Sequence, residues 1–248
     1  MMEVEAGRLR RRSGLCRVIA HRGYSSAFPE NSVESYERAI AAGADVVEID
    51  LRQSRDRTVV CHHDATAEGA NIADLSLHEL AGRGVVSLSD VLPRLLGRVC
   101  LLFDLKLPTL DLAAAALSLL QDRAMAPQSV IGVRSLEQAK FVRKASAEIV
   151  ILGFLPDRAD FERFYALGGD IARLWEEDCS EERLQAARCG DHPVWVTAGR
   201  RSRDGRPGDI DVPRLERLIR WNIDGILVND PVRAIRARDG QIDRSGLE

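Results

Sequence analysis

The sequence lacks an apolar run long enough to cross a bilayer. Runs such as Val99–Phe103 fall far short of the roughly 20 residues that a membrane-spanning helix needs, so we expect no stable membrane association. It also lacks an excess of positive charge, because 35 Lys and Arg stand against 38 Asp and Glu. Without a basic field, nucleic acid is not an expected partner.

Cysteine is scarce, and the five that occur are never spaced as Cys-x-x-Cys. An odd number of scattered cysteines is typical of reduced thiols in a cytoplasmic protein, which is the location we expect.

Four arginines lie within residues 8–12, but no apolar stretch follows them, so the pattern is not that of a secretory signal. We expect this segment to be a frayed tail.

The 248 residues are an alternation of short apolar runs and longer segments of helical period. This alternation predicts an α/β fold with parallel strands and right-handed crossovers. Eight strand–helix units in roughly 250 residues predict a (β/α)8 TIM barrel in one domain spanning 1–248. A doubly wound open sheet is the alternative. The expected strands are Cys16–Ala20, Val46–Leu51, Val99–Leu105, Ser129–Val133, Ile149–Phe154, Ile171–Leu174, Pro193–Thr197 and Gly225–Val228.

The second unit departs from this regular pattern. Gln53–Arg57 has the composition of a turn, so Thr58–Cys61 is expected to return beside the second strand as a hairpin. Residues 65–98 would then form a small cap insertion with one or two short helices, among them Leu88–Leu96. Asn31 precedes Glu34 by three residues, which is the spacing of a helix N-cap.

Acidic residues collect where two of the predicted strands end. Glu48 and Asp50 are two apart, so they share one face of their strand, and Asp104 and Lys106 repeat this spacing on the next barrel strand. Two carboxylates roughly 4 Å apart repel by about 4 kcal/mol at an effective dielectric constant near 20. Three together favour a cation, and oxygen ligands favour Mg²⁺ or Ca²⁺. The alternative is that Glu48 and Asp50 merely pair with Arg22 and Lys106 as a structural ion-pair network.

Two histidines accompany these acids. His21 ends the first strand and His63 follows the hairpin, and an imidazole titrates near neutral pH, as a general acid and base must. Arg22 and Lys106 are suited to hold an anionic group. Neither a Ser-His-Asp pattern nor a glycine-rich phosphate loop competes with this interpretation.

Together these residues resemble the glycerophosphodiester phosphodiesterase family. Its pattern appears as His21-Arg22-Gly23, Pro29-Glu30-Asn31-Ser32, Glu48-Ile49-Asp50, His63-Asp64 and Asp104-Leu105-Lys106. The resemblance implies a (β/α) barrel in which Glu48, Asp50 and Asp104 bind a divalent cation, Mg²⁺ or Ca²⁺. It implies that His21 and His63 transfer protons and that Arg22 and Lys106 bind the phosphate. Glu30 and Asn31 would shape the site near His21, and Asn31 could also cap the following helix.

The activity that the resemblance implies is hydrolysis of a glycerophosphodiester to sn-glycerol 3-phosphate and an alcohol. Asp104 replaces the Glu usual in the family, and the family's Trp-Thr-Val-Asn is reduced to Trp195-Val196-Thr197-Ala198. The arginine-rich loop 199–209 is either a solvated segment or a lid that meets an anionic part of the substrate. Alternatives are a related phosphodiesterase acting on lysophospholipid or phosphoinositol-type substrates, and a catalytically weak phosphate-binding homologue. The sequence leaves the alcohol and the oligomeric state open, a homo-oligomer included.

Overall fold

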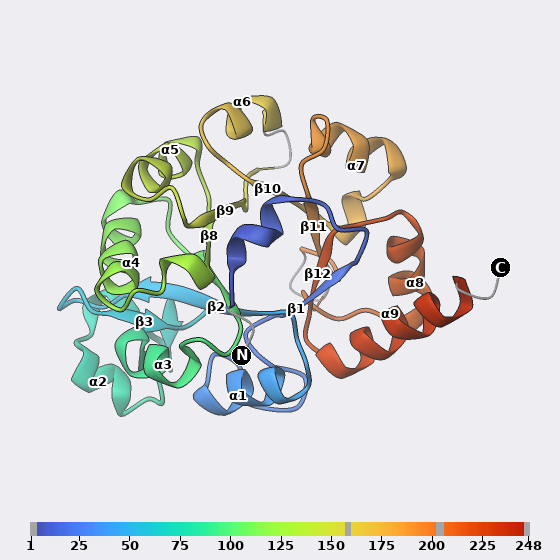
Figure 1. Ribbon diagram of the computed structural model, residues 1–248. Coiled ribbons are helices and arrows are strands. Elements are labelled where there is room, and N and C mark those ends of the chain that lie inside the picture. The colour runs from blue at the N-terminus through green and yellow to red at the C-terminus, as the bar shows by residue number, and fades with distance from the viewer. Residues whose placement is uncertain (1–3, 157–159, 202–205, 246–248) are drawn as a thin grey trace.

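The computed structural model describes residues 4–156, 160–201 and 206–245, and it contains the predicted barrel. Eight parallel strands close on themselves in the order β1-β2-β7-β8-β9-β10-β11-β12, because β1 pairs with both β2 and β12. The helices lie around the outside of this ring (Figure 1). The (β/α)8 fold is therefore confirmed, and the open sheet is excluded.

The eight barrel strands coincide with the predicted runs to within one or two residues. Each is followed, directly or after an excursion, by at least one helix. The barrel strands are β1 Arg17–Ala20, β2 Val46–Gln53, β7 Cys100–Leu105, β8 Ser129–Val133, β9 Val150–Gly153, β10 Ile171–Trp175, β11 Val194–Thr197 and β12 Gly225–Val228. The α-helices are α1 Val33–Ala41, α2 Leu77–Ala81, α3 Leu88–Leu95, α4 Leu110–Asp122, α5 Leu136–Ala145, α6 Phe161–Ala166, α7 Glu181–Arg188, α8 Val212–Arg220 and α9 Pro231–Ser245.

The predicted hairpin and insertion are present. β3 (Val59–Cys61) runs antiparallel to β2 and pairs on its other side with β6 (Val86–Ser87). Between β3 and β7 lie the short pair β4 (Thr66–Ala67) and β5 (Ala70–Asn71), then α2 and α3. This excursion covers one side of the barrel beside α1 (Figure 1). That the whole chain forms a single domain stays a prediction.

The N-terminal segment contradicts the expectation of a frayed tail. Residues Ala6–Arg10 form a 3₁₀ helix, η1, whose Ala6 and Leu9 are buried against the apolar residues inside the barrel. The guanidinium of Arg10 donates to the carbonyl oxygens of residues 147–149. Two apolar side chains one turn apart thus cover the end of the barrel opposite to the strands' carboxyl ends, a long-range contact that the local sequence does not reveal.

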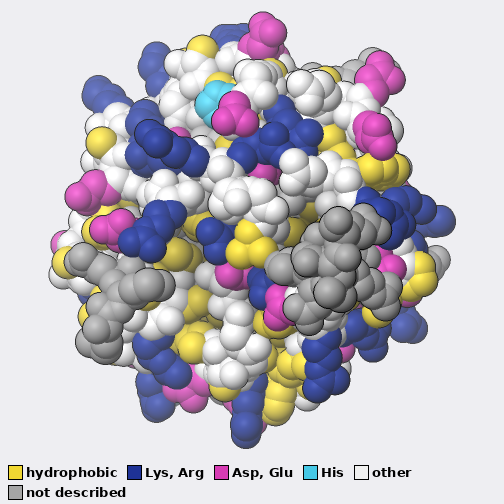
Figure 2. All heavy atoms as spheres, turned by 45° about the vertical axis from the view of Figure 1, so that its right-hand side comes forward, with side chains coloured by type: hydrophobic (Ala, Val, Ile, Leu, Met, Phe, Trp, Pro, Cys, Tyr) yellow, Lys and Arg dark blue, Asp and Glu magenta, His cyan; other side chains and the backbone are white. Residues whose placement is uncertain are grey.

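Charge on the surface is mixed. On the face drawn in Figure 2, basic and acidic side chains are both present, scattered among polar and apolar ones, and the net charge of the chain is −3. None of the described helices is both long and apolar enough to cross a membrane.

Candidate active site

The turn after β1 places His21 and Arg22 at the barrel mouth. Arg22 has a φ of 57° and Gly23 a φ of 81°, and a Cβ on Gly23 would lie 2.4 Å from the Oγ of Ser35. Only glycine fits there. Arg22 bears a backbone strain of about 1–3 kcal/mol, while its N–H donates to Glu48 Oε2 at 2.7 Å.

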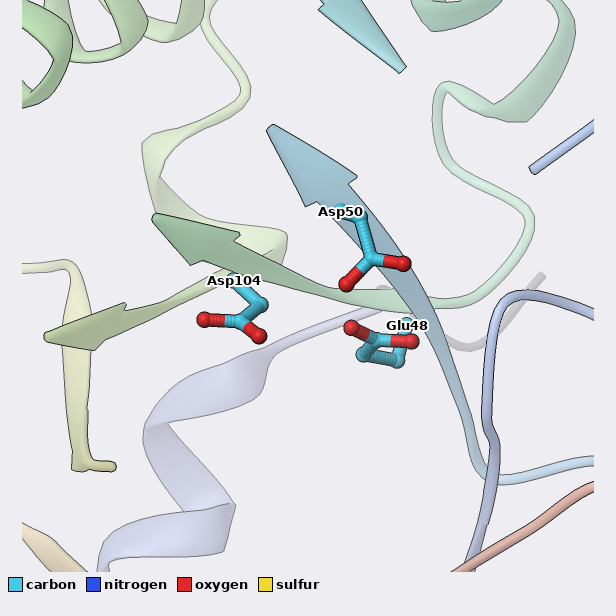
Figure 3. A group of neighbouring side chains, drawn as sticks. All are labelled: Glu48, Asp50 and Asp104. Carbon is cyan, nitrogen blue, oxygen red and sulfur yellow. The ribbon is translucent and has the colours of Figure 1, made fainter. Parts of the chain in front are cut away.

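The three predicted acids converge. Glu48 and Asp50 project from β2 and Asp104 from β7, and the strand register places Asp50 opposite Asp104. One carboxylate oxygen of each lies within 4.8 Å of the others, and Figure 3 shows the three groups facing one another. Burial, and then the negative charges of Asp50 and Asp104, raise the pKa of Glu48 well above its usual range.

Cations already contact two of these carboxylates. Lys106 Nζ lies 2.8 Å from both Asp50 and Asp104, and the Nε of Arg22 lies 3.2 Å from Asp50. Burial alone would raise the pKa of Asp50, but Lys106 and Arg22 hold it well below its usual range. The ion-pair network considered as an alternative therefore exists for Asp50, and it also includes Asp104. Glu48 is different, because the bond it accepts among the described residues comes from a backbone N–H.

Asp104 has a second cationic partner that the sequence did not indicate. Arg134, which follows β8, donates to both oxygens of Asp104, at 2.6 and 2.8 Å. The shorter side chain of Asp104, compared with Glu, still reaches the cluster, where it contacts both Arg134 and Lys106.

The donor set of the cluster fits a hard divalent cation. All three ligand candidates are buried carboxylates, and oxygen ligands are those that Mg²⁺ and Ca²⁺ prefer. Asp50 Oδ1 is buried without a hydrogen bond in the described structure and meets Lys106 only as an ion pair. Glu48, Asp50 and Asp104 could therefore hold a divalent ion.

Asn229 fixes the tautomer of His21. Its amide nitrogen donates to Pro207 O and Asp209 Oδ1, both at 2.9 Å, so its Oδ1 must be the atom 2.8 Å from His21 Nδ1. The ring accordingly carries hydrogen on Nδ1 and a lone pair on Nε2. Burial, followed by the charge of Arg22, lowers the pKa of His21 to about 3, so the ring is neutral at neutral pH.

His63 lines the same cavity as His21 but has a different hydrogen-bond partner. Its Nδ1 lies 2.8 Å from Asp64 Oδ1, and its carbonyl accepts two bonds from the guanidinium of Arg52. Burial, and then the charge of Lys106, lower the pKa of His63, whereas the hydrogen bond to Asp64 opposes the shift. Because a carboxylate can only accept, His63 also presents Nε2 as its free nitrogen.

Asn31 and Glu30 contact residues of the site, but Asn31 is not the N-cap of α1 as expected. The N-cap of α1 is Ser32, whose side chain accepts from Ser35 N, so the N-cap interpretation of Asn31 is wrong by one residue. Asn31, with a φ of 53°, donates from Nδ2 to Asp50 Oδ2 at 2.8 Å and accepts from Asp50 N. Glu30 pairs with Arg22 at 2.8 Å.

The structure shows a cavity at the site, and several of its lining residues were not predicted from the sequence. A cavity of about 250 Å³ is lined on one side by His21, Arg22, Glu48, His63, Asp104 and Lys106. Its other side includes residues in β10 and at or just beyond the ends of β8–β11, namely Arg134, Phe154, Arg173, Trp175 and Thr197. The available signal was that Arg173 and Trp175 share the inward face of β10 with Ile171, where a charged residue is unexpected. Part of the loop 199–209 lies outside the described residues, so neither view of that loop is tested.

The sequence of this chain is similar to those of several known proteins. The family model described as the glycerophosphoryl diester phosphodiesterase family matches residues 21–147. A glycerophosphodiester phosphodiesterase from Caldanaerobacter subterraneus is 43% identical over 51 residues, and a human lysophospholipase D is 44% identical over 48. These segments cover 21% and 19% of this chain and only 21% and 15% of the relatives' own lengths.

The likeness to solved structures extends over the whole barrel. A phosphodiesterase from Oleispira antarctica, solved in complex with the product sn-glycerol 3-phosphate, superposes with a TM-score of 0.76 at 21% identity. The match covers 91% of this chain and 97% of that structure. At this identity the likeness bears on the fold alone.

Proposed function

The chain belongs to the glycerophosphoryl diester phosphodiesterase family, and from this we propose that it hydrolyses glycerophosphodiesters to sn-glycerol 3-phosphate and an alcohol. The observation that carries the proposal is a pair of histidines, each held at Nδ1, that line one cavity beside a cluster of three buried carboxylates. A site that only binds phosphate would need no such pair for proton transfer, which speaks against the weak phosphate-binding homologue.

We assign the proton transfers to His21 and His63. His21 is neutral and held by Asn229, so its Nε2 can accept a proton from the attacking hydroxyl. Asp64 partly offsets the lowering of the His63 pKa by burial and Lys106, and we assign to the protonated ring the donation of a proton to the oxygen of the departing alcohol. Arg22 and Lys106 supply positive charge for the phosphate oxygens. Glu30 and Asn31 keep Arg22 and Asp50 in position.

We also propose that activity depends on a divalent cation, Mg²⁺ or Ca²⁺, held by Glu48, Asp50 and Asp104. When bound, such an ion offsets the negative charge that develops on the phosphate. Lys106 and Arg134, which pair with these acids in this structure, would then be free to face the substrate.

The five free cysteines favour a cytoplasmic location.

A lysophospholipid is the second candidate substrate, favoured by the similarity to a human lysophospholipase D. The charged lining of the cavity and its size of about 250 Å³ favour a small polar diester instead. The test is release of sn-glycerol 3-phosphate from glycerophosphocholine and glycerophosphoethanolamine, compared with choline release from lysophosphatidylcholine. His63→Ala serves as the inactive control. Faster turnover of the lysophospholipid, or no sn-glycerol 3-phosphate from either diester, would contradict the proposal.

A further inference from the structure

Arg173 is a buried cation to which the proposed chemistry gives no role. It lies in the middle of β10 with only 8% of its surface exposed, and it lines the cavity. Its Nε is buried without a hydrogen bond, and the described structure shows no ion pair for its guanidinium. Burying an unpaired charge is costly, so this arrangement indicates a site prepared for an anion.

The other cations of the cavity are already paired. Arg22 meets Asp50, Lys106 meets Asp50 and Asp104, and Arg134 meets Asp104. Arg201 at the rim pairs with Glu177 and Asp178. In the described part of the cavity lining, Arg173 alone among the cations forms no ion pair, and the charge of Asp104 acts on it only from beyond ion-pair distance.

Aromatic rings hold the guanidinium of Arg173 in place without using its donors. Its Cζ lies 4.6 Å from the ring centroid of Trp175 and 5.0 Å from that of Phe154. Gly132 leaves room for the Phe154 ring, because a Cβ there would come within 2.4 Å of it. Cation–π contacts stabilise the charge, but its Nε–H still lacks an acceptor among the described residues.

A second unsatisfied polar atom borders the same cavity. The hydroxyl of Thr197 is buried and has no hydrogen-bond partner in the described structure. Thr197 ends β11 directly opposite Trp175 in the strand register. A hydroxyl donor and a guanidinium therefore border the same small volume from neighbouring strands.

This pair lies across the barrel from the phosphate-binding residues. In the closed ring, β10 is three strands from β7 and three strands from β1. A diester whose phosphate meets Arg22 and Lys106 would therefore extend one arm towards Arg173. We propose that Arg173 and Thr197 form a second anion subsite, which recognises a carboxylate or phosphate on the alcohol arm of the diester. The inference rests on the proposed function for the identity of the diester.

The test uses two substrates that differ by one carboxylate, glycerophosphoserine and glycerophosphoethanolamine. Both arms carry an ammonium group, so the ratio of their kcat/KM values isolates the carboxylate. We expect the wild type to prefer glycerophosphoserine by roughly 10- to 100-fold, the range for a charge-assisted contact. Arg173→Gln should bring the ratio close to one, and Arg173→Lys should retain part of the preference.

Arg188→Gln provides a matched control. Arg188 is also 8% exposed with a buried, unpaired Nε, but it ends α7 and does not line the cavity. This variant should keep the wild-type ratio. A wild-type ratio near one, or a ratio that Arg173→Gln leaves unchanged, would overturn the inference.

Binding measurements separate the inference from the proposed function. Phosphoserine and phosphoethanolamine differ by the same carboxylate and can be titrated by calorimetry without turnover. If neither diester is hydrolysed but phosphoserine binds more tightly in an Arg173-dependent manner, the subsite stands and the proposed function fails. If both diesters are hydrolysed at equal kcat/KM, the proposed function stands and the subsite fails.

Discussion

At the scale of single residues, His21 and His63 line the same side of the cavity, and each has its Nδ1 held by a neighbouring oxygen, which leaves Nε2 free. We expect His21→Ala and His63→Ala each to lower kcat by roughly 10²- to 10⁴-fold, with the far-ultraviolet circular dichroism unchanged. In the double variant the losses should be far from additive, because both residues act in one sequence of proton transfers. A variant that keeps near wild-type kcat would remove that histidine from the chemistry.

Asn229 positions His21 without reaching the substrate itself. Asn229→Ala removes the acceptor that holds hydrogen on Nδ1, so we expect kcat to fall roughly 10-fold or more while KM changes little. Asn229→Asp keeps an acceptor at this place and should recover part of the loss. Equal kcat in wild type and Asn229→Ala would show that the tautomer is fixed by other means.

Single residues also mark the limit of what the sequence could reveal. The acids and histidines were predictable because they occur at strand ends with the spacing of one strand face. Arg134, Arg173 and Asn229 were not, because each is an isolated polar residue whose importance depends on which neighbours the closed barrel places beside it.

At the scale of elements, the turn between β1 and α1 carries a site residue, Arg22, on a backbone with positive φ at Arg22 and Gly23. Gly23→Ala would add a Cβ at a φ of 81° and against Ser35. Gly84 has a similar φ of 75° but nothing within 4 Å of the added carbon. We expect Gly84→Ala to cost about 1–2 kcal/mol of unfolding free energy, and Gly23→Ala at least about 1 kcal/mol more. Urea unfolding of the two variants measures the difference, and equal losses would show that the turn can relax away from Ser35.

Elements were predictable where burial on both faces leaves a continuous apolar run, as in β8 and β12. The hairpin of β2 and β3 was predictable because Gln53–Arg57, which lies between the two strands, has the composition of a turn. The start of α1 was misplaced because Asn31 and Ser32 are both good N-cap residues, and only the contact with Asp50 decides between them. The segment η1 was missed since its stabilising contacts lie far away in the sequence.

At the scale of the whole molecule, the barrel brings residues from β1, β2, β3 and β7 to one side of the mouth and residues from β8–β11 to the other. The first half of the chain carries the acid cluster and both histidines, which the family model also covers. The second half supplies Arg173, which lines the cavity, and Asn229, which holds His21. The oligomeric state stays a prediction, and so does the expectation that nucleic acid is not a partner.

The central claim is that a divalent cation held by Glu48, Asp50 and Asp104 is needed for hydrolysis of a glycerophosphodiester. Its most direct test is release of sn-glycerol 3-phosphate from glycerophosphoethanolamine before and after treatment with excess EDTA. We predict that EDTA abolishes the release, that Mg²⁺ or Ca²⁺ restores it, and that Glu48→Gln needs more of the ion for the same rate. Full activity in excess EDTA would contradict the account.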